Sequence, residues 1–118
     1  MFSPQHLRSS TAIRDVFAAR CVAGGQHVTA HILLRPDSAP SRVTVVAGRG
    51  VGSAVVRNRA KRRVRECLRQ AGLPPGVDVV ISSQSSAATV PLTELCAEVG
   101  EVLRRGVRRA ADKRPAQR

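Results

Sequence analysis

Apolar residues recur at intervals of three and four positions in three segments of the chain, which is the spacing of one face of an α-helix. Helices are therefore expected over about residues 10–20, 54–71 and 91–109. Ser9 or Ser10 can cap the first helix, and Gly72 can end the second. In the third helix Gly106 is a weak point, because glycine is a poor helix former.

Three shorter segments are β-branched or alternate between apolar and polar residues, which predicts strands. They lie at residues 27–34, 42–48 and 76–83. In the first, Val28, Ala30 and Ile32 point to one side. Only the turn PDSAPS separates the first two strands, so we expect them to pair antiparallel. The third is mostly apolar, which suits a buried parallel position. The order α-β-β-α-β-α predicts an α+β sandwich with a small sheet.

A length of 118 residues corresponds to one domain with a modest core. We expect the domain to span residues 9–109, with an N-terminal arm at residues 1–8 and a basic disordered tail at residues 110–118. No apolar run approaches the ~20 residues of a membrane span, and the N-terminus lacks the apolar region of a signal peptide. The expected location is the cytoplasm.

The three cysteines, Cys21, Cys67 and Cys96, are far apart and odd in number. Their spacing fits neither a disulfide framework nor a zinc site. Cys67 and Cys96 fall within apolar helical patterns. We therefore expect buried free thiols in a reducing cytosol.

The chain is strongly basic, with 20 Lys and Arg against 8 Asp and Glu, a net charge of +12 and a pI near 11.7. Such an excess indicates a polyanionic partner. Nearly all the basic residues are arginine, whose planar guanidinium suits phosphate pairing and base stacking. A GC-rich coding bias is an equal explanation for the choice of arginine, but it does not explain the net charge. The chain has no Trp or Tyr and only two Phe, which argues against an aromatic platform for single strands.

The basic residues concentrate in the second predicted helix, within the segment VGSAVVRNRAKRRVREC (residues 51–67), which contains one acid, Glu66. Its apolar stripe is expected to pack on the sheet and consists of Val56, Ala60, Val64, Cys67, Leu68 and Ala71. A solvated helix face usually mixes both signs of charge. Arg57 and Arg59 also lie in the first turn, where the helix dipole disfavours cations. An external polyanion resolves both conflicts, so we interpret this helix as a binding site.

The segment VGSAVVRNRAKRRVRE closely resembles the signature of the protein subunit of bacterial ribonuclease P, including its RNR element at residues 57–59. The FAAR motif of the first helix, the strand order and the DVVI strand fall in the same order as in that family, over about residues 7–108. The resemblance implies a fold like domain 2 of ribosomal protein S5, with a left-handed β-α-β crossover. Strand order alone would predict the right-handed form.

The resemblance also implies a function. In that family the holoenzyme removes the 5′ leader from precursor tRNA by metal-assisted hydrolysis, and a catalytic RNA with Mg²⁺ bound mainly to it carries out the chemistry. A protein nuclease would need clustered carboxylates, whereas the acids of this chain are scattered. His6, His27 and His31 form no recognised nuclease arrangement, and we expect ordinary surface histidines. No catalytic residue is therefore expected in the protein, and its metal ligands are left open.

Residue roles follow from the resemblance by matching position. Six residues should contact the catalytic RNA, namely Arg57, Asn58, Arg59, Lys61, Arg62 and Arg65. Arg49 matches a commonly basic position in the preceding connection. Arg57 lies near the edge of the apolar stripe, so it could instead brace the loop before the helix. Contacts of this kind read the backbone and shape of folded RNA.

The family's leader-binding cleft lies between the first helix and the open face of the sheet. Phe17 matches its helical aromatic residue, Ile13 shares the same helix face, and His31 falls where a strand aromatic is common. His31 stacks on a base more weakly than tyrosine would. Phe17 has an alternative place in the core, because Ile13, Val16 and Phe17 all favour burial.

Other classes of protein fit the sequence less well. A ribosomal-type structural RNA-binding protein would share the size, charge and fold, but the RNR element argues against it. A DNA-binding protein would place the basic helix in the major groove, and this helix has one face committed to the sheet and no helix-turn-helix partner. A protein-only nuclease ranks lowest.

Overall fold

The computed structural model describes residues 5–113, except the side chains of Arg49 and Lys113. In chain order the elements are β1 (Gln5–His6), α1 (Ser10–Ala18), β2 (Val22–Gly24), β3 (Val28–Leu34), β4 (Arg42–Val46), the 3₁₀ helix η1 (Arg49–Val51), α2 (Ala54–Ala71), β5 (Val77–Ser83), the 3₁₀ helix η2 (Ser85–Ala88) and α3 (Leu92–Lys113). The predicted α+β class is confirmed. Residues 1–4 of the predicted arm and 114–118 of the predicted tail lie outside the described residues.

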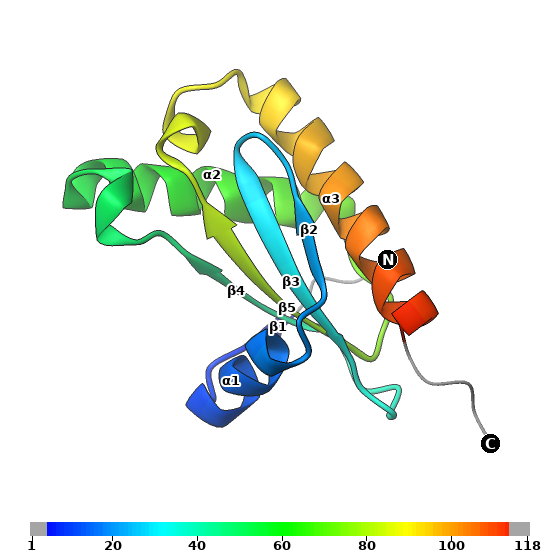
Figure 1. Ribbon diagram of the computed structural model, residues 1–118. Coiled ribbons are helices and arrows are strands. Elements are labelled where there is room, and N and C mark those ends of the chain that lie inside the picture. Colours follow the sequence, from blue (N-terminus) through cyan, green and yellow to red (C-terminus); the bar gives the residue numbers. More distant parts are fainter. Residues whose placement is uncertain (1–4, 114–118) are drawn as a thin grey trace.

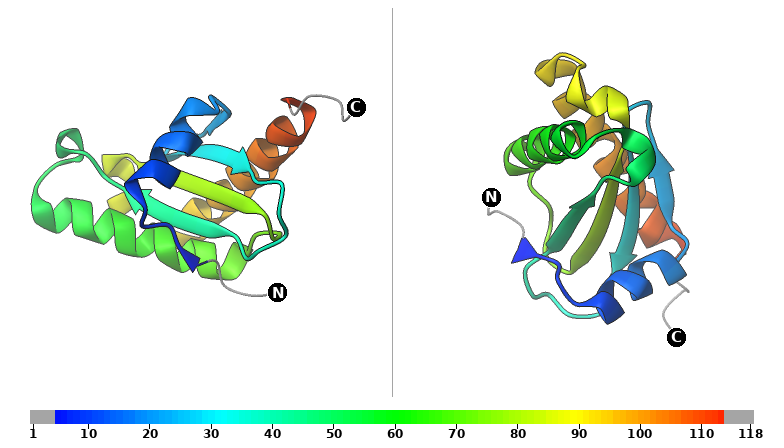
Figure 2. Two further views of the ribbon diagram at one scale, coloured as in Figure 1. Left: turned by 90° about the horizontal axis from the view of Figure 1, so that it is seen from below. Right: turned by 90° about the vertical axis from the view of Figure 1, so that its left-hand side faces the viewer.

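The sheet has the strand order β1-β4-β5-β3-β2, with α1 on one face and α2 and α3 on the other (Figures 1 and 2). The predicted antiparallel pair of the first two long strands is wrong. β5 lies between β3 and β4, antiparallel to the first and parallel to the second. The reason is burial: six of its seven residues are buried, so a central position covers both of its faces and both of its edges.

Two short strands were not predicted from the sequence. β1 pairs parallel with β4, and β2 forms an antiparallel hairpin with β3. Strands of two and three residues are too short to show a period of two. Residues 5–7 of the predicted arm therefore belong to the fold, and Leu7 is fully buried under α1. At the other end α3 continues to Lys113, so residues 110–113 are helical rather than disordered.

The connection from β4 through α2 to β5 is left-handed, as the family resemblance implied. The two strands are parallel neighbours that run towards the upper left in Figure 1, with β5 to the right of β4. Helix α2 passes behind the sheet, on the face opposite α1 (Figure 2, left). The right-handed form is the general rule, so tertiary packing overrides it here. The outcome is that α2 and α3 lie together on one face, while α1 covers only part of the other.

The main core lies between the sheet and the layer of α2 and α3, and a smaller one under α1 contains Leu7, Val16 and Val80. As predicted, α2 buries Ala60, Val64, Cys67 and Leu68. Gly106 does not interrupt α3. A Cβ at this position would lie 2.7 Å from Ile32 Cγ1, so the glycine allows the helix to approach β3 closely.

A buried carboxylate fastens the end of the sheet. Asp78 on β5 is only 1% exposed, and Arg42 binds it through two hydrogen bonds, Nε to Oδ1 at 2.9 Å and Nη2 to Oδ2 at 2.6 Å. Arg35 also pairs with Asp78, and its Nη2 donates to the carbonyl of Ala39 at 2.8 Å. The carboxylate thus connects β5 to β4 and to the β3–β4 loop, and the two cations offset the cost of burying it.

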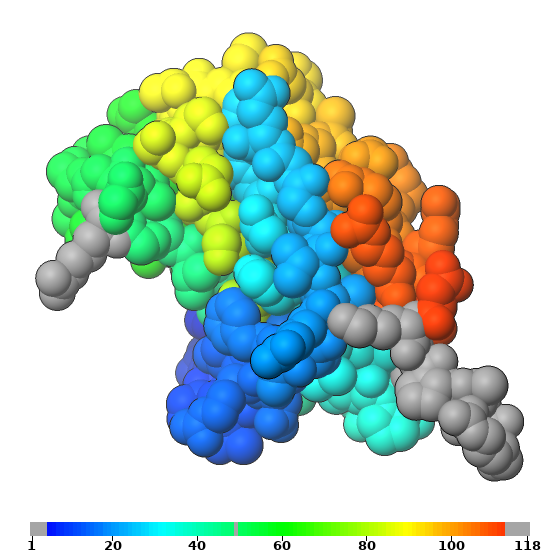
Figure 3. Space-filling view, in the orientation of Figure 1, coloured from blue at the N-terminus to red at the C-terminus, as the bar shows by residue number. Residues whose placement is uncertain are grey.

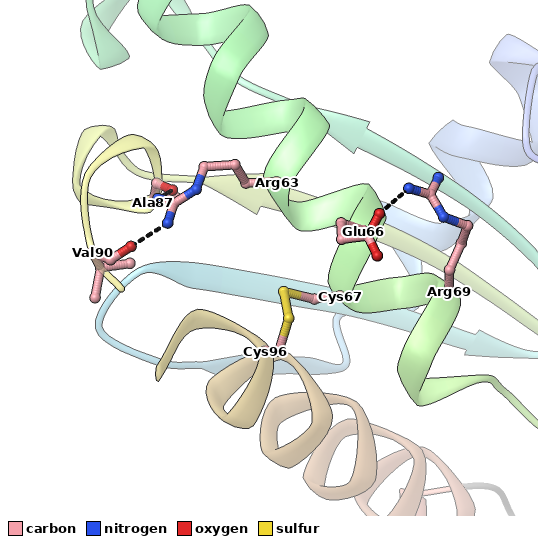
Figure 4. The surroundings of a disulfide bond; sticks show 7 residues. All are labelled: Arg63, Glu66, Cys67, Arg69, Ala87, Val90 and Cys96. Carbon is pink, nitrogen blue, oxygen red and sulfur yellow. Dashed lines mark hydrogen bonds and ion pairs between the residues drawn. A yellow bond between two sulfur atoms is a disulfide. The ribbon is translucent and has the colours of Figure 1, made fainter. Parts of the chain in front are cut away.

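The prediction of three free thiols is wrong for two of them. Cys67 on α2 and Cys96 on α3 form a disulfide, with Cα atoms 4.6 Å apart (Figure 4). The two residues are 29 positions apart in the chain, and only the packing of the two helices brings them together. Cys21 is free and buried, as predicted. None of the helices within the described residues is long and apolar enough to span a membrane.

Candidate nucleic-acid interface

Helix α2 begins at a capped turn that directs its first residues outward. Gly52 has φ +136°, a value that side-chain-bearing residues rarely adopt, and it connects η1 to the helix. Ser53 accepts a hydrogen bond from the backbone N–H of Val56 at 3.4 Å, which caps the helix. One side of α2 is buried against α3, η2 and the sheet, and the opposite side faces solvent.

Most of the predicted RNA-contacting residues lie on that solvent-facing side. Asn58, Arg59, Arg62 and Arg65 are exposed, and Lys61 is half-buried. Within the part of the chain that the structure describes, the four basic residues of this group form no ion pair with a carboxylate. Their charges therefore remain available to an external anion. We call Asn58, Arg59, Lys61, Arg62 and Arg65 together the α2 basic surface.

Two other arginines of α2 are used within the protein. Arg57 donates from Nη1 to the carbonyl of Gly52 at 3.0 Å, so it braces the loop before the helix. This is the alternative that its position near the apolar stripe had suggested. Arg63 donates to the carbonyls of Ala87 and Val90, which anchors α2 to η2 and the turn before α3 (Figure 4). Near the end of the helix Glu66 pairs with Arg69, and that hydrogen bond lowers the pKa of the glutamate.

A hollow of about 290 Å³ lies between α2 and the edge strands. β1 pairs with only two residues of β4, Arg42 and Val43. The hollow begins where this pairing ends and extends along the next residues of β4. Its lining includes His6, Thr44, Arg65 and Arg69. Sequence reasoning missed His6 as a neighbour of the basic surface, because β1 is too short to be seen in the pattern.

The three residues predicted for the leader cleft come together between α1 and the sheet. Phe17 is 44% exposed, and its ring centroid lies 4.7 Å from that of His31 in an edge-to-face arrangement. Figure 3 shows the blue atoms of α1 projecting below the sheet, with β3 and β5 reaching the surface above it. Phe17 is therefore not a core residue. Val16 and, in part, Ile13 fill the core beneath it.

Two further features shape this surface. Val22 on β2 is paired with His31 and is 38% exposed, so it extends the apolar patch that Phe17 begins. Burial lowers the pKa of His31, so its imidazole is neutral at pH 7. A neutral ring stacks and hydrogen-bonds without adding charge. The surface between α1 and the sheet, with Phe17, Val22 and His31, is called the α1 cleft below.

His27 is not the ordinary surface residue that the sequence suggested. It is buried, with Nδ1 2.7 Å from Ser86 Oγ and Nε2 3.2 Å from Glu94 Oε2. Its backbone N–H and that of Val28 both donate to Glu98 Oε2, at 2.6 and 2.9 Å. These contacts hold the β2–β3 hairpin against η2 and α3, which is a structural role.

Arg49, predicted to contact RNA, opens η1, but its side chain lies outside the described residues. Among the described residues no group of three or more His, Cys, Asp or Glu is placed to hold a metal ion. Asp78 is bound by arginines, Glu66 by Arg69, and Glu98 by backbone amides. These three carboxylates are thus engaged in the fold, whereas Asp15 on α1 is exposed.

The sequence matches known proteins over most of its length. The family model described as Ribonuclease P matches residues 1–107. The chain is 36% identical over 101 residues to the ribonuclease P protein component of Symbiobacterium thermophilum, a match that covers 84% of this chain and 88% of that protein. It is 34% identical over 107 residues to the ribonuclease P protein component of Kocuria rhizophila, a match that covers 89% of this chain and 94% of that protein.

Solved structures share the fold. The RNase P protein from Thermotoga maritima superposes with a TM-score of 0.74 at 22% identity and covers 86% of this chain and 96% of its own. The Staphylococcus aureus RNase P protein gives a TM-score of 0.72 at 13% identity, and the match covers 86% of this chain and 94% of that one. At these identities the structures establish the architecture, whereas the sequence matches establish kinship.

Proposed function

This chain belongs to the bacterial ribonuclease P protein family, the protein subunit of the ribonucleoprotein that processes precursor tRNA at its 5′ end, and we propose a role for each of its two surfaces. The α2 basic surface binds the catalytic RNA, and the α1 cleft binds the 5′ leader of precursor tRNA. The two surfaces lie on different sides of the sheet. One small protein can therefore contact both RNAs at once.

The observation that carries the first role is the one-signed charge of α2. Arg59, Lys61, Arg62 and Arg65 are held on a rigid helix whose opposite face is buried, and no acid of the described chain neutralises them. Phosphates would neutralise them and release counterions, which makes binding strongly salt-dependent. Arg57 acts indirectly, by bracing the loop before the helix. Arg49 adds a further RNA contact from η1.

The second role rests on exposed aromatic and apolar groups beside the sheet. Phe17 offers an open ring face for a base, and His31 supports that ring from the side. Base–aromatic stacking tolerates any sequence, because every base has a π face. This suits a leader whose sequence differs from one tRNA to another. Ile13 positions Phe17 from the same helix.

We also propose that the catalytic RNA, with Mg²⁺ bound mainly to it, carries out the hydrolysis. The proposed location of the complex is the cytoplasm. Support comes from Glu66, Asp78 and Glu98, which bind arginines or backbone amides within the fold. The protein then contributes affinity and position. Its absence should be most costly at low Mg²⁺, where the RNAs repel one another most.

Reconstitution tests these roles. The protein is added to ribonuclease P RNA and precursor tRNA at low Mg²⁺, and leader cleavage is measured. Cleavage should rise with the wild type and much less with Arg59→Ala/Arg62→Ala, whose RNA affinity should show a salt slope lower by roughly 0.7–0.9 per lost phosphate contact. Arg104→Ala/Arg108→Ala, which removes two exposed charges of α3, is the matched control for net charge.

The alternative function, a ribosomal-type structural RNA-binding protein without a role in cleavage, predicts a different result. Such a protein would bind RNA without increasing cleavage at any Mg²⁺ concentration. Equal salt slopes for the wild type and the Arg59→Ala/Arg62→Ala variant would refute the role of the α2 basic surface, even if cleavage were stimulated.

A further inference from the structure

The disulfide connects the helix that carries the α2 basic surface to α3. Cys67 lies on the buried stripe of α2 and is 1% exposed, whereas Cys96 on α3 is half-buried (Figure 4). The free thiol Cys21 is buried elsewhere, with Sγ 3.5 Å from the carbonyl oxygen of Gly106. The three sulfurs thus differ in how easily solvent reaches them.

Both halves of the disulfide line an open groove between α2 and α3, with a volume of about 940 Å³. Gln70 and Leu73 form part of its α2 side, and Arg104 and Arg108 part of its α3 side. A groove of this size admits a small organic molecule. Cys96 is half-buried and lines this groove, so a solute that enters the groove meets this half of the disulfide.

The two arginines of the groove differ from their neighbours on α3. Arg105 and Arg109 donate to the carbonyls of Gly24 and Val22, at 3.0 and 2.8 Å, and so cover the edge of β2. Within the described part of the chain Arg104 forms no hydrogen bond or ion pair through its side chain, and the same holds for Arg108. Their charges face the groove and favour an anionic occupant.

We propose that this groove is a thiol–disulfide exchange site whose substrate is a small thiol that carries a carboxylate. The thiolate of this substrate attacks Sγ of Cys96, the Sγ–Sγ bond breaks, and Cys67 leaves as a thiolate that takes up a proton. A second substrate thiolate attacks the substrate sulfur of the mixed disulfide. This step releases the oxidised substrate dimer and leaves Cys96 as a thiol. The reverse sequence, with the dimer as oxidant, restores the bond.

Exchange breaks the disulfide, which is one of several contacts that hold α2 in the fold. The buried stripe of the helix and the hydrogen bonds of Arg63 to Ala87 and Val90 remain when the disulfide opens. The reduced protein therefore stays folded, with α2 less firmly held. Disulfides in reducing compartments are commonly transient and redox-sensing. If opening the disulfide changes RNA binding by α2, that effect rests on the proposed function. The exchange reaction itself does not.

The test uses the full-length oxidised protein without RNA, so its outcome is independent of the proposed function. The protein is incubated at low salt with 3-mercaptopropionate or with 2-mercaptoethanol, quenched with iodoacetamide, and analysed by peptide mass mapping. We expect Cys96, which is half-buried, to be labelled and Cys21, which is buried, to stay unlabelled. We also expect a mixed disulfide on Cys96 and a rate linear in thiolate concentration. The rate should not change in low, non-denaturing urea.

Charge selectivity is measured as the rate ratio of the anionic to the neutral thiol, each corrected for its thiolate fraction. A unit charge about 10 Å away changes a rate in water by roughly twofold at low salt, so Arg104→Gln/Arg108→Gln should lower the ratio by roughly fourfold. Arg8→Gln/Arg14→Gln, which removes two charges near α1, should leave it unchanged. The proposal is overturned if Cys21 is labelled at the same rate as the disulfide is reduced, because reduction then requires unfolding. It is also overturned if both double variants give the wild-type rate ratio.

Discussion

Replacing Phe17 with alanine separates leader binding from protein stability. Phe17 is 44% exposed, so the change removes about half of the burial that a core phenylalanine would lose. Phe→Ala in a core costs about 3–5 kcal/mol, which leaves roughly 2 kcal/mol here, including the edge-to-face contact with His31. Unfolding of a chain of 118 residues has an entropy of about 0.25 kcal/mol/K, so Tm should fall by roughly 8 °C.

The expected loss of leader affinity is similar in free energy to this change in stability, so the two are separated by comparing precursor with mature tRNA. Base–aromatic stacking contributes about 1–3 kcal/mol, so precursor tRNA should bind the holoenzyme roughly 5- to 150-fold more weakly. Mature tRNA lacks the leader and should bind as before. The assay is the ratio of the two affinities, measured at least 20 °C below the Tm of the variant. Leu92→Ala is the control, because it shortens an exposed apolar side chain on α3, which covers the other face of the sheet. An unchanged ratio for Phe17→Ala would remove Phe17 from the leader site.

Three further predictions concern the stability of the fold and are checked by thermal or urea unfolding. Asp78→Ala leaves two arginines without their buried partner and should cost about 3 kcal/mol or more, a loss that high salt reduces only in part. Reducing the disulfide between Cys67 and Cys96, which closes a loop of 29 positions, should cost about 3.6 kcal/mol in the chain-entropy description; equal Tm for the oxidised and reduced forms would contradict it. Gly76→Ala should cost about 1–3 kcal/mol, because Gly76 has φ +82° and a Cβ would lie 2.7 Å from the carbonyl oxygen of Asp37, whereas Gly50→Ala meets open space and should be nearly neutral.

The helices and the basic surface could be predicted from the sequence because their causes are local. The apolar period of α2, its capping serine and Gly72 at its end specify the observed range, Ala54–Ala71. The same period determines which side chains are buried, so Arg59 and Arg62 must face outward. Arg20, with φ 54°, ends α1 two residues before the predicted end.

Individual roles within the basic cluster depended on contacts between distant segments. Arg63 looks equivalent to Arg59 in the sequence, whereas the position of Arg57 near the apolar stripe already suggested its local role. The carbonyl of Gly52 binds Arg57, and those of η2 and the turn after it bind Arg63. A partner 24 or more positions away leaves no trace in local spacing.

Strand order and the disulfide were decided by the tertiary structure alone. A strand's period shows which side chains share a face, but hydrogen bonds along its two edges can be made with any other strand. β5 takes the centre because burial on both faces is most favourable there, and this separates β3 from β4 although only a short turn joins them. The left-handed path of α2 then places it beside α3, and that proximity brings Cys67 to Cys96. Local sequence thus determines which elements form and which face each buries, whereas the pairing of these faces and edges depends on the free energy of the whole packed chain.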